Sequence, residues 1–293
     1  MEQRNIARKI KARVSSVFPG VFPPSAQQKR VATVIDITFV DGACSPEERP
    51  HVFNIPQAEV AEYGMKSFEA RDWRKYFTDN LSGRGLEIGP LHRPMVKHDG
   101  MQMEYVDRCS VAELRAHYPE LNELPLVEPD VIDDAESLSS VADQTYDFLI
   151  SAHVIEHMRN PLSSLEQWCR VVKPGGYIYM VVPDKRAIFD SRRVRTTLEH
   201  IILDYREPSQ ERDREHFLEF ALHVNGRSGN DAVEEMRNLI KTDYSIHFHV
   251  FIPSDVVKML EWFSENVRPL EIVEGPCMTP GSDEFHFLLK VGQ

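Results

Sequence analysis

Two polar segments near the middle of the chain each follow a short apolar run, and their residue types suit the binding of a nucleoside. In residues 86–90 (LEIGP) the run ends at Gly89, and a glycine lets the backbone approach a ligand closely. Asp107 ends the next run, 20 residues after Glu87. An acid at about this distance from a glycine turn can accept hydrogen bonds from both hydroxyls of a ribose. A surface acid at the end of a strand is the alternative interpretation of Asp107.

Two further polar segments end the next two runs. Asp133 and Asp134 follow the third run, where a carboxylate can accept a hydrogen bond from an adenine amino group. The fourth run continues into Ser151, Ala152 and His153. If the four runs are parallel strands, their polar ends meet at the carboxyl edge of one sheet, where doubly wound folds bind their ligands.

The elements that position these residues can be predicted from hydrophobic patterning. From Gly85 onward, short apolar runs alternate with helical patterns, which indicates a parallel sheet with crossover helices. Crossover helix Pro161–Val172 is the clearest, and a later helix is expected over Ser254–Val267, after which two runs predict a terminal hairpin. The expected strands are Leu86–Ile88, Glu104–Val106, Val127–Ile132, Tyr146–Ser151, Gly176–Val182, Leu270–Cys277 and Glu284–Val291.

The segment 85–183 resembles the core of a class I S-adenosylmethionine-dependent methyltransferase, closest to the type 11 group that includes enzymes of ubiquinone and menaquinone biosynthesis. The resemblance is carried by LEIGP (86–90), YVD (105–107), DDAESL (133–138), YDFLISAHVIEHM (146–158) and LEQWCRVVKPGGYIYMVVPD (165–184). It implies an α/β fold with a Rossmann-like, doubly wound, mostly parallel seven-stranded sheet and a C-terminal antiparallel hairpin. It also implies S-adenosylmethionine as the methyl donor and S-adenosylhomocysteine as the product.

The resemblance also implies roles for single residues. The family usually has a second glycine where this chain has Leu91, so we expect the loop after Gly89 to take a different path. Asp133 is the alternative to Asp134 as the acid near the adenine. The implied cofactor-binding residues are Glu87, Gly89 and Pro90 for the methionine part, Asp107 for the ribose, Asp134 and the Ala135 amide for the adenine, and Ser151, Ala152 and His153 beside the sulfonium and the acceptor.

Histidines are the candidate general bases, because an oxygen acceptor must lose its proton during methyl transfer. The candidates are His153, His216, His247 and His249. If the stretch around Phe248 is extended, His247 and His249 point to the same face. Such a pair could bind a metal or orient a substrate; we expect no metal.

The chain divides into an N-terminal extension, residues 1–60, and a methyltransferase domain, residues 61–293. The extension contains a basic amphipathic pattern over residues 1–18 that could contact a membrane, pack on the domain or serve a homodimer. A helix is expected over Glu59–Asn80. Residues 184–250, here called the insert, are expected to form a helical lid over the acceptor. Five basic residues of the insert could bind an anion, or could form ion pairs with the many acidic residues of the insert. They are Lys185, Arg186, Arg192, Arg193 and Arg195.

Composition narrows the function further. The net charge of −12 argues against nucleic-acid binding. The four cysteines form no CxxC pair, which excludes a zinc ribbon and fits a reducing compartment, so we expect a cytoplasmic location. The charged, histidine-rich insert favours O-methylation of a small-molecule or sugar-containing acceptor. The alternatives are N-methylation of an amino sugar or a peptide, and a catalytically idle fold that serves as a scaffold.

Overall fold

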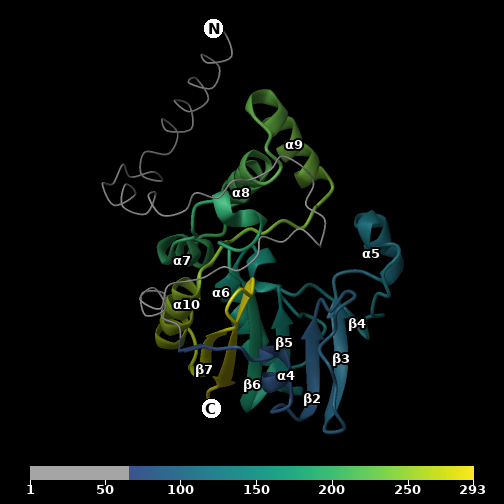
Figure 1. The fold of residues 1–293 in the computed structure, drawn as a ribbon, viewed down its shortest axis with the longest axis vertical. Helices are drawn as coiled ribbons and strands as arrows, with labels where there is room; N and C mark the ends of the chain where they lie inside the picture. The colour runs from purple at the N-terminus through teal and green to yellow at the C-terminus, as the bar shows by residue number, and fades with distance from the viewer. Residues whose placement is uncertain (1–65) are drawn as a thin grey trace.

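The computed structural model describes residues 66–293, which form one sheet with helices on both faces and a helical region beyond one end of the strands (Figure 1). The predicted N-terminal extension, residues 1–60, and its basic helix lie outside the described residues. No helix among residues 66–293 is long and apolar enough to cross a membrane.

The sheet has eight strands in the order β1-β7-β8-β6-β5-β2-β3-β4. Neighbours among β2 to β6 pair in parallel, whereas β8 runs antiparallel to both β6 and β7. The predicted fold class is confirmed, and a strand lies in each of the seven predicted segments. The prediction Val127–Ile132 was wrong for residues 127–130, which are irregular, because only Val131–Ile132 pairs with β3. Beside β7, β1 adds an eighth strand to the described sheet. The strands are β1 (Ser67–Phe68), β2 (Gly83–Ile88), β3 (Met101–Asp107), β4 (Val131–Ile132), β5 (Tyr146–Ala152), β6 (Val172–Pro183), β7 (Leu270–Met278) and β8 (Glu284–Val291).

Alternation of side chains along the central strands gives the sheet two buried faces. Ile178 and Met180 of β6 pack into one hydrophobic cluster together with Trp168 of α6 (Pro161–Val171). Tyr179, between them in sequence, packs into a second cluster with Phe77 of α4 (Trp73–Thr78). The first face is also covered by α7 (Leu198–Arg206) and α10 (Pro253–Asn266), whereas α5 (Val111–His117) follows β3.

The start of the described chain differs from the predicted helix over Glu59–Asn80. Ser67–Phe68 forms the edge strand β1, and the helix is confined to Trp73–Thr78. It begins there because the side chain of Asp72 accepts a hydrogen bond from the backbone N–H of Lys75, an N-cap that the aromatic pattern concealed. The helix prediction was therefore wrong for residues 66–72.

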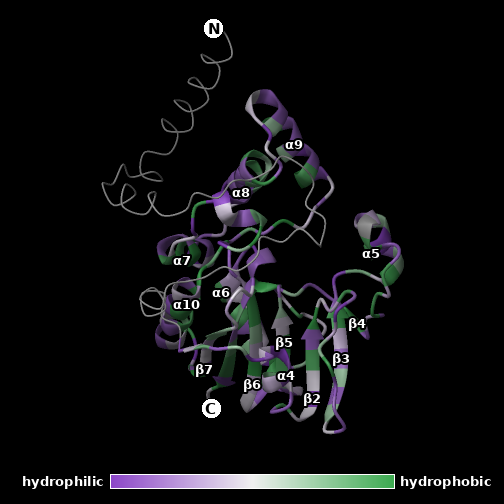
Figure 2. Cartoon of the chain, viewed as in Figure 1, coloured by the Kyte–Doolittle hydropathy of each residue, from purple (hydrophilic) through white to green (hydrophobic). Residues whose placement is uncertain are grey.

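The insert contributes the helical region beyond the sheet. It holds α7, α8 (Gln210–His223) and α9 (Gly229–Lys241), and α8 and α9 stand beyond the arrowheads of β2, β3 and β5 (Figure 1). A small core of Phe217, Phe220, Leu239, Ile246 and Phe248 joins α8, α9 and the segment that returns to α10. Hydrophobic residues concentrate in the sheet, whereas much of α9 is hydrophilic (Figure 2). Within the insert, α8 and α9 thus have a core of their own, whereas α7 packs on the sheet.

Candidate functional site

The strand register brings the predicted polar segments to one edge of the sheet. Ile88 is paired with both Val106 and Ser151, so the residues that follow β2, β3 and β5 are neighbours. Pro183, at the end of β6, is paired with Glu284, the first residue of β8. The carboxyl edge of the parallel strands therefore also receives the start of an antiparallel strand, which sequence reasoning did not place there.

The glycine loop after β2 is open toward the end of β5. Gly89 has φ +58°, a conformation that favours glycine, and a Cβ added there would approach only Val154, at 3.8 Å. Leu91 adopts φ +46°, so the chain makes a left-handed turn where the family usually has its second glycine. The loop therefore keeps a glycine-like conformation at the position where we expected a departure.

Glu87 lies beneath this loop and is 1% exposed. Its carboxylate accepts a hydrogen bond from the backbone N–H of Met95, 3.0 Å from Oε1, and so closes the loop that contains Pro90. Burial raises the pKa of Glu87 to about 7, against the hydrogen bond from Met95 and the positive charge of Arg74. In the ligand-free protein the side chain shapes the loop.

Replacing Glu87 with glutamine should raise the melting temperature of the ligand-free protein by several degrees at pH 8 and much less at pH 5. The folded-state pKa, about 7, lies above the ordinary value of 4.5, so the wild-type carboxyl stabilises the fold below pH 4.5. This stabilisation is lost as the pH rises through 7. The loss in the free energy of unfolding is about 1.4 kcal/mol for each unit by which the folded-state pKa exceeds the ordinary pKa. Thermal unfolding between pH 5 and 8 measures this difference in melting temperature, with the exposed Glu123→Gln as control. An equal effect of Glu87→Gln at both pH values would contradict it.

Asp107 ends β3 beside the loop. Its Oδ1 accepts a hydrogen bond from the backbone N–H of Arg108 at 2.7 Å. Burial raises the pKa of Asp107 to about 6, although this hydrogen bond and the charge of Arg108 oppose the rise. A buried carboxylate at a strand end is costly to hold without further donors, and ribose hydroxyls would supply them.

The two acids in the segment after β4, Asp133 and Asp134, have different surroundings. Asp133 accepts hydrogen bonds from the backbone N–H groups of Asp134 and Ser140, so its oxygens hold the loop together. Asp134 is exposed, and its Oδ1 accepts from the backbone N–H of Glu136. The Ala135 carbonyl accepts from the indole N–H of Trp168, which anchors this loop to α6. Of the two acids, Asp134 is the one placed to meet a ligand.

His153 follows β5 and joins an ion-pair network. Its Nε2 lies 2.8 Å from Oε2 of Glu284, and the Glu284 carboxylate receives two hydrogen bonds of 2.7 Å from the guanidinium of Arg74. Burial lowers the pKa of His153, but the hydrogen bond to Glu284 and the charge of Glu156 outweigh it and raise the pKa above its ordinary value. The His153 side chain is 35% exposed, so a ligand at this edge can reach it. Its φ of +55° is an uncommon conformation for a non-glycine residue.

Behind His153, the carboxylate of Glu156 is buried and neither oxygen has a hydrogen-bond partner. Oε1 lies 3.9 Å from Nδ1 of His153 and 4.0 Å from Nε2 of His247. His247 in turn contacts Asp190 through Nδ1 at 2.6 Å. Burial raises the pKa of Glu156, while the two nearby imidazoles oppose the rise. Ser151, also 0% exposed, has an unpartnered hydroxyl near the same strand end.

The other three candidate bases occupy two different clusters. The stretch around Phe248 is irregular and not an extended strand, so the condition under which His247 and His249 would share a face is not met. His249 and His216 are buried inside the insert, against the partly exposed His200. Only His153 and His247, of the four candidates, contact the network at the strand ends.

The cations of the insert are paired within the chain. Arg193, fully buried, binds Asp190 at 2.9 Å and Glu219 at 3.0 Å. Arg195 binds Asp255, Arg186 binds Asp184, and Lys185 donates to the carbonyl of Ser191. Arg192 also has an interaction partner. Internal pairing, one of the two interpretations of this cluster, therefore accounts for these cations.

Sequence reasoning missed Arg74, Glu156, Asp190 and Glu284 as members of the site. Glu284 had a detectable signal, since it opens the second strand of the predicted hairpin and must lie beside the end of β6. Arg74 had no detectable signal in the sequence, because it lies on α4, which precedes the first recognised motif.

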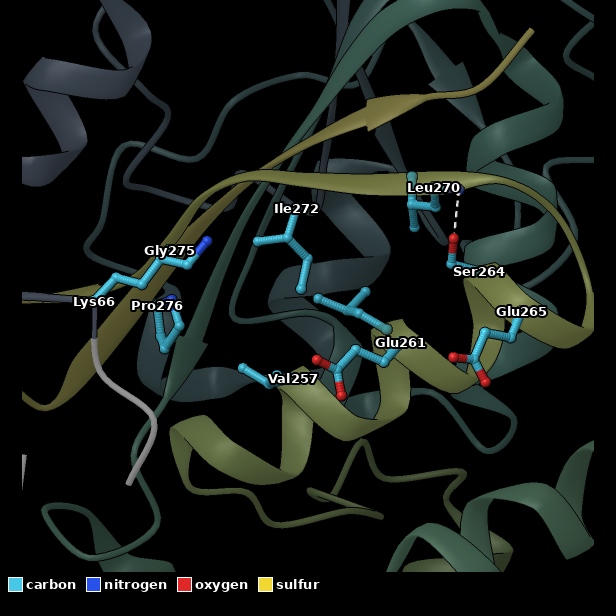
Figure 3. Close-up of a pocket in the computed structure, with 10 residues that line it drawn as sticks. Lys66, Val257, Glu261, Ser264, Glu265, Leu270, Ile272, Gly275 and Pro276 are labelled. Atoms are coloured by element: carbon cyan, nitrogen blue, oxygen red, sulfur yellow. Dashed lines mark hydrogen bonds between the residues drawn. The ribbon is translucent and has the colours of Figure 1, made fainter. Parts of the chain in front are cut away.

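Two pockets lie away from this edge. One, of about 360 Å³, is formed by α10 and β7 and is lined by apolar residues together with Lys66, Glu261, Ser264 and Glu265 (Figure 3). β8 and β6 separate β7 from β5, which carries His153. The second, of about 250 Å³, lies at the opposite ends of β5 and β6, around 173–177. Neither pocket contains the polar groups that the strand ends bring together.

The residues at the strand ends fit S-adenosylmethionine. The backbone at Gly89 is open to a ligand, and Asp107 offers a half-buried carboxylate that could bind a ribose. Asp134 is exposed and could accept a hydrogen bond from an adenine, and Ser151 has a hydroxyl without a partner. These groups lie on four adjacent strands, β4-β3-β2-β5. A nucleoside cofactor along that edge would meet them in order, with His153 at the far end.

Comparisons with known proteins agree with this fit. The profile of a family described as "Methyltransferase domain" matches residues 63–225. No curated protein matches the chain. Among solved structures, the chain is similar to an S-adenosylmethionine-dependent methyltransferase from Aquifex aeolicus, with 14% identity, 80% of this chain and 94% of that chain covered, and a TM-score of 0.39.

Two other solved structures show the same level of likeness. A methyltransferase from Methanosarcina mazei is 17% identical, with 76% of this chain and 97% of that chain covered and a TM-score of 0.37. The CurJ carbon methyltransferase is 13% identical over 72% of this chain, with a TM-score of 0.38, and this chain spans 49% of its length. Sequence identities and TM-scores this low give no argument about the acceptor. The profile covers more than half of the residues, and on that ground the chain belongs to the methyltransferase domain family, as a class I S-adenosylmethionine-dependent methyltransferase.

Proposed function

We propose that the enzyme methylates a hydroxyl oxygen of a small-molecule or sugar-containing acceptor, with His153 as the general base. The observation that carries the proposal is the contact between His153 and Glu284 at the end of β5. A hydroxyl needs its proton removed as the new bond forms, whereas an unprotonated amine does not. A partly exposed histidine, oriented by the carboxylate of Glu284, suits this task.

The network gives each residue a distinct role. When bound, S-adenosylmethionine supplies a methyl group on a positively charged sulfur, ready for transfer. Arg74 holds the carboxylate of Glu284, which accepts the Nε2 proton of His153 and fixes the ring. Nδ1 of His153 then carries the lone pair that takes the proton of the acceptor. The unpartnered carboxylate of Glu156, 3.9 Å from Nδ1, stabilises the imidazolium that results.

Turnover with a panel of acceptors tests the proposal. Isotope-labelled S-adenosylmethionine is incubated with the enzyme and sugars, glycosides and phenols, each paired with its deoxy analogue and its amino analogue. We expect label in a hydroxyl compound and none in its deoxy partner. Label in amino analogues alone would replace the proposal with N-methylation. Binding of the cofactor without turnover of any compound would favour the scaffold alternative.

Other expectations stay predictions. They are a cytoplasmic location, the absence of nucleic-acid binding, a homodimer, and contact of residues 1–18 with a membrane surface. The proposed acceptor class depends on none of them.

A further inference from the structure

Three histidines and an aspartate meet inside the insert. His200 and Asp204 lie one turn apart on α7, His216 lies on α8, and His249 lies on the segment before α10. One ligand atom from each residue lies within 4.8 Å of those of the other three. The ring centroids of His200, His216 and His249 are 4.9 to 5.7 Å apart, so the imidazoles surround one point.

Two polar contacts inside this cluster depend on a single ring nitrogen. Nε2 of His200 lies 3.0 Å from Nε2 of His216 and 3.0 Å from Oδ2 of Asp204. A ring nitrogen carries either a proton or a lone pair. If Nε2 of His200 carries a proton, Asp204 and the lone pair of His216 must share that one donor. If it carries a lone pair, Asp204 Oδ2 has no donor from it, and this oxygen has no hydrogen-bond partner in the structure.

His249 adds a second, independent observation. It is 0% exposed, and its Nδ1 is buried without any hydrogen-bond partner. A buried polar atom without a partner is costly, and such atoms in a folded protein call for an explanation. His249 belongs to the set of residues whose ligand atoms converge with those of Asp204 and His216. A cation between the four residues would use every one of these lone pairs.

The surrounding residues orient two of the ligands. Nε of Arg212 donates to Oδ1 of Asp204 at 2.5 Å, which leaves Oδ2 facing the cluster. Nε2 of His249 lies 3.3 Å from the carbonyl of Arg159, so Nδ1 is the ring nitrogen that remains available to a ligand. Metal-binding histidines and carboxylates are commonly held in this way, with the remote atom hydrogen-bonded to the protein.

We propose that His200, Asp204, His216 and His249 bind one divalent transition-metal ion, with zinc as the ion that this set of ligands suits best. Three imidazoles and one carboxylate can complete a tetrahedral shell, and imidazole nitrogen suits zinc better than magnesium or calcium. Four protein ligands leave no open position, which is typical of structural sites. The ion would fasten α7, α8 and the segment before α10 to one another.

A second group, Glu156, His157 and His247, also has converging ligand atoms, and its imidazoles are held in the same way. Nδ1 of His157 lies 2.9 Å from the carbonyl of Ile246, and Nδ1 of His247 lies 2.6 Å from Asp190. With only three residues, however, this group would leave a coordination position open. The four-residue cluster is therefore the better-built site, and the two can be separated by mutation.

Metal content tests the proposal without any use of enzymatic activity. The full chain, produced without a histidine tag, is reconstituted with zinc, passed through gel filtration and analysed by mass spectrometry of the elements. We expect one zinc per wild-type chain, a loss of that zinc in His200→Ala and in His249→Ala, and its retention in His247→Ala and in the exposed His223→Ala. Zinc that is lost in His247→Ala but kept in His200→Ala would overturn the assignment. A wild-type protein that retains no metal would overturn the proposal as a whole.

Two measurements on the wild type guard against variants that simply fail to fold. Cobalt substituted for zinc should give the intense visible absorption of a tetrahedral site. Removal of the metal by a chelator should lower the melting temperature by roughly 5–10 °C. A weak, octahedral cobalt spectrum, or a melting temperature that the chelator leaves unchanged, would contradict a four-ligand structural site. Binding of S-adenosylmethionine in the chelated protein shows separately whether the cofactor site survives.

Discussion

Replacing His153 with glutamine should lower kcat by roughly 10²–10⁴-fold while it leaves the affinity for S-adenosylmethionine within a few-fold of the wild type. The reason is that His153 is the partly exposed histidine at the strand ends, and its ring is held by Glu284 at 2.8 Å. Glutamine keeps a similar reach and a hydrogen-bonding end but cannot accept a proton. Steady-state kinetics on an acceptor identified by the panel, with calorimetry of cofactor binding, separate the two effects.

The pH profile gives an independent test of the same role. Because the base must be unprotonated, kcat should rise with pH through the raised pKa of His153. Glu284→Gln removes the hydrogen bond to a charged carboxylate that raises this pKa, so the rise should move to lower pH. The exposed His117→Gln should leave both kcat and the profile unchanged. A His153→Gln enzyme with wild-type kcat, or a Glu284→Gln profile that moves to higher pH, would exclude His153 as the base.

Replacing Asp107 with alanine should weaken binding of S-adenosylmethionine roughly 30–1000-fold, since two hydrogen bonds to a charged group are lost at about 1.5–3 kcal/mol each before partial compensation by water. Asp107→Asn should have a smaller effect, because an amide oxygen still accepts. Calorimetric titration measures both. Asp99→Ala, which removes an exposed acid just before β3, is the matched control and should bind as the wild type does.

The charge of Asp107 predicts how this affinity depends on pH. Its pKa is about 6 in the ligand-free protein, and the charged form is the one that binds hydroxyl donors well. Affinity should therefore fall as the pH drops through 6, and this dependence should be absent in Asp107→Ala. Wild-type affinity in the alanine variant would exclude Asp107 as the ribose ligand.

The sheet and the edge proposed to bind the cofactor were predictable because their signals are local. Each strand is a short apolar run that ends in a polar residue, and parallel strands must present those ends together. The first three motifs also occur in chain order, so the position of Asp107 relative to Gly89 follows from spacing alone. The strand pairing of the structure agrees with these predictions.

The network around His153 was not predictable to the same degree. Glu284 is 131 residues away from His153, and its approach depends on the antiparallel return of β8 beside β6. Glu156 follows His153 by three residues, but an unpaired buried carboxylate has no sequence signal. The sequence of the insert shows many charged residues and histidines but does not indicate which of them are in contact. The reason is that short helices joined by irregular segments can pack in many ways.

The ion pair between Arg74 and Glu284 has a consequence for any shortened version of the enzyme. The two residues lie 210 positions apart, on the first helix and the last strand of the described chain, and the bond fastens these ends together beside the proposed base. A chain trimmed to the recognisable motifs, from residue 81 onward, would keep every residue predicted to bind the cofactor. It would nevertheless lose the guanidinium that keeps Glu284 charged, so transplanting the sheet alone would separate cofactor binding from proton transfer.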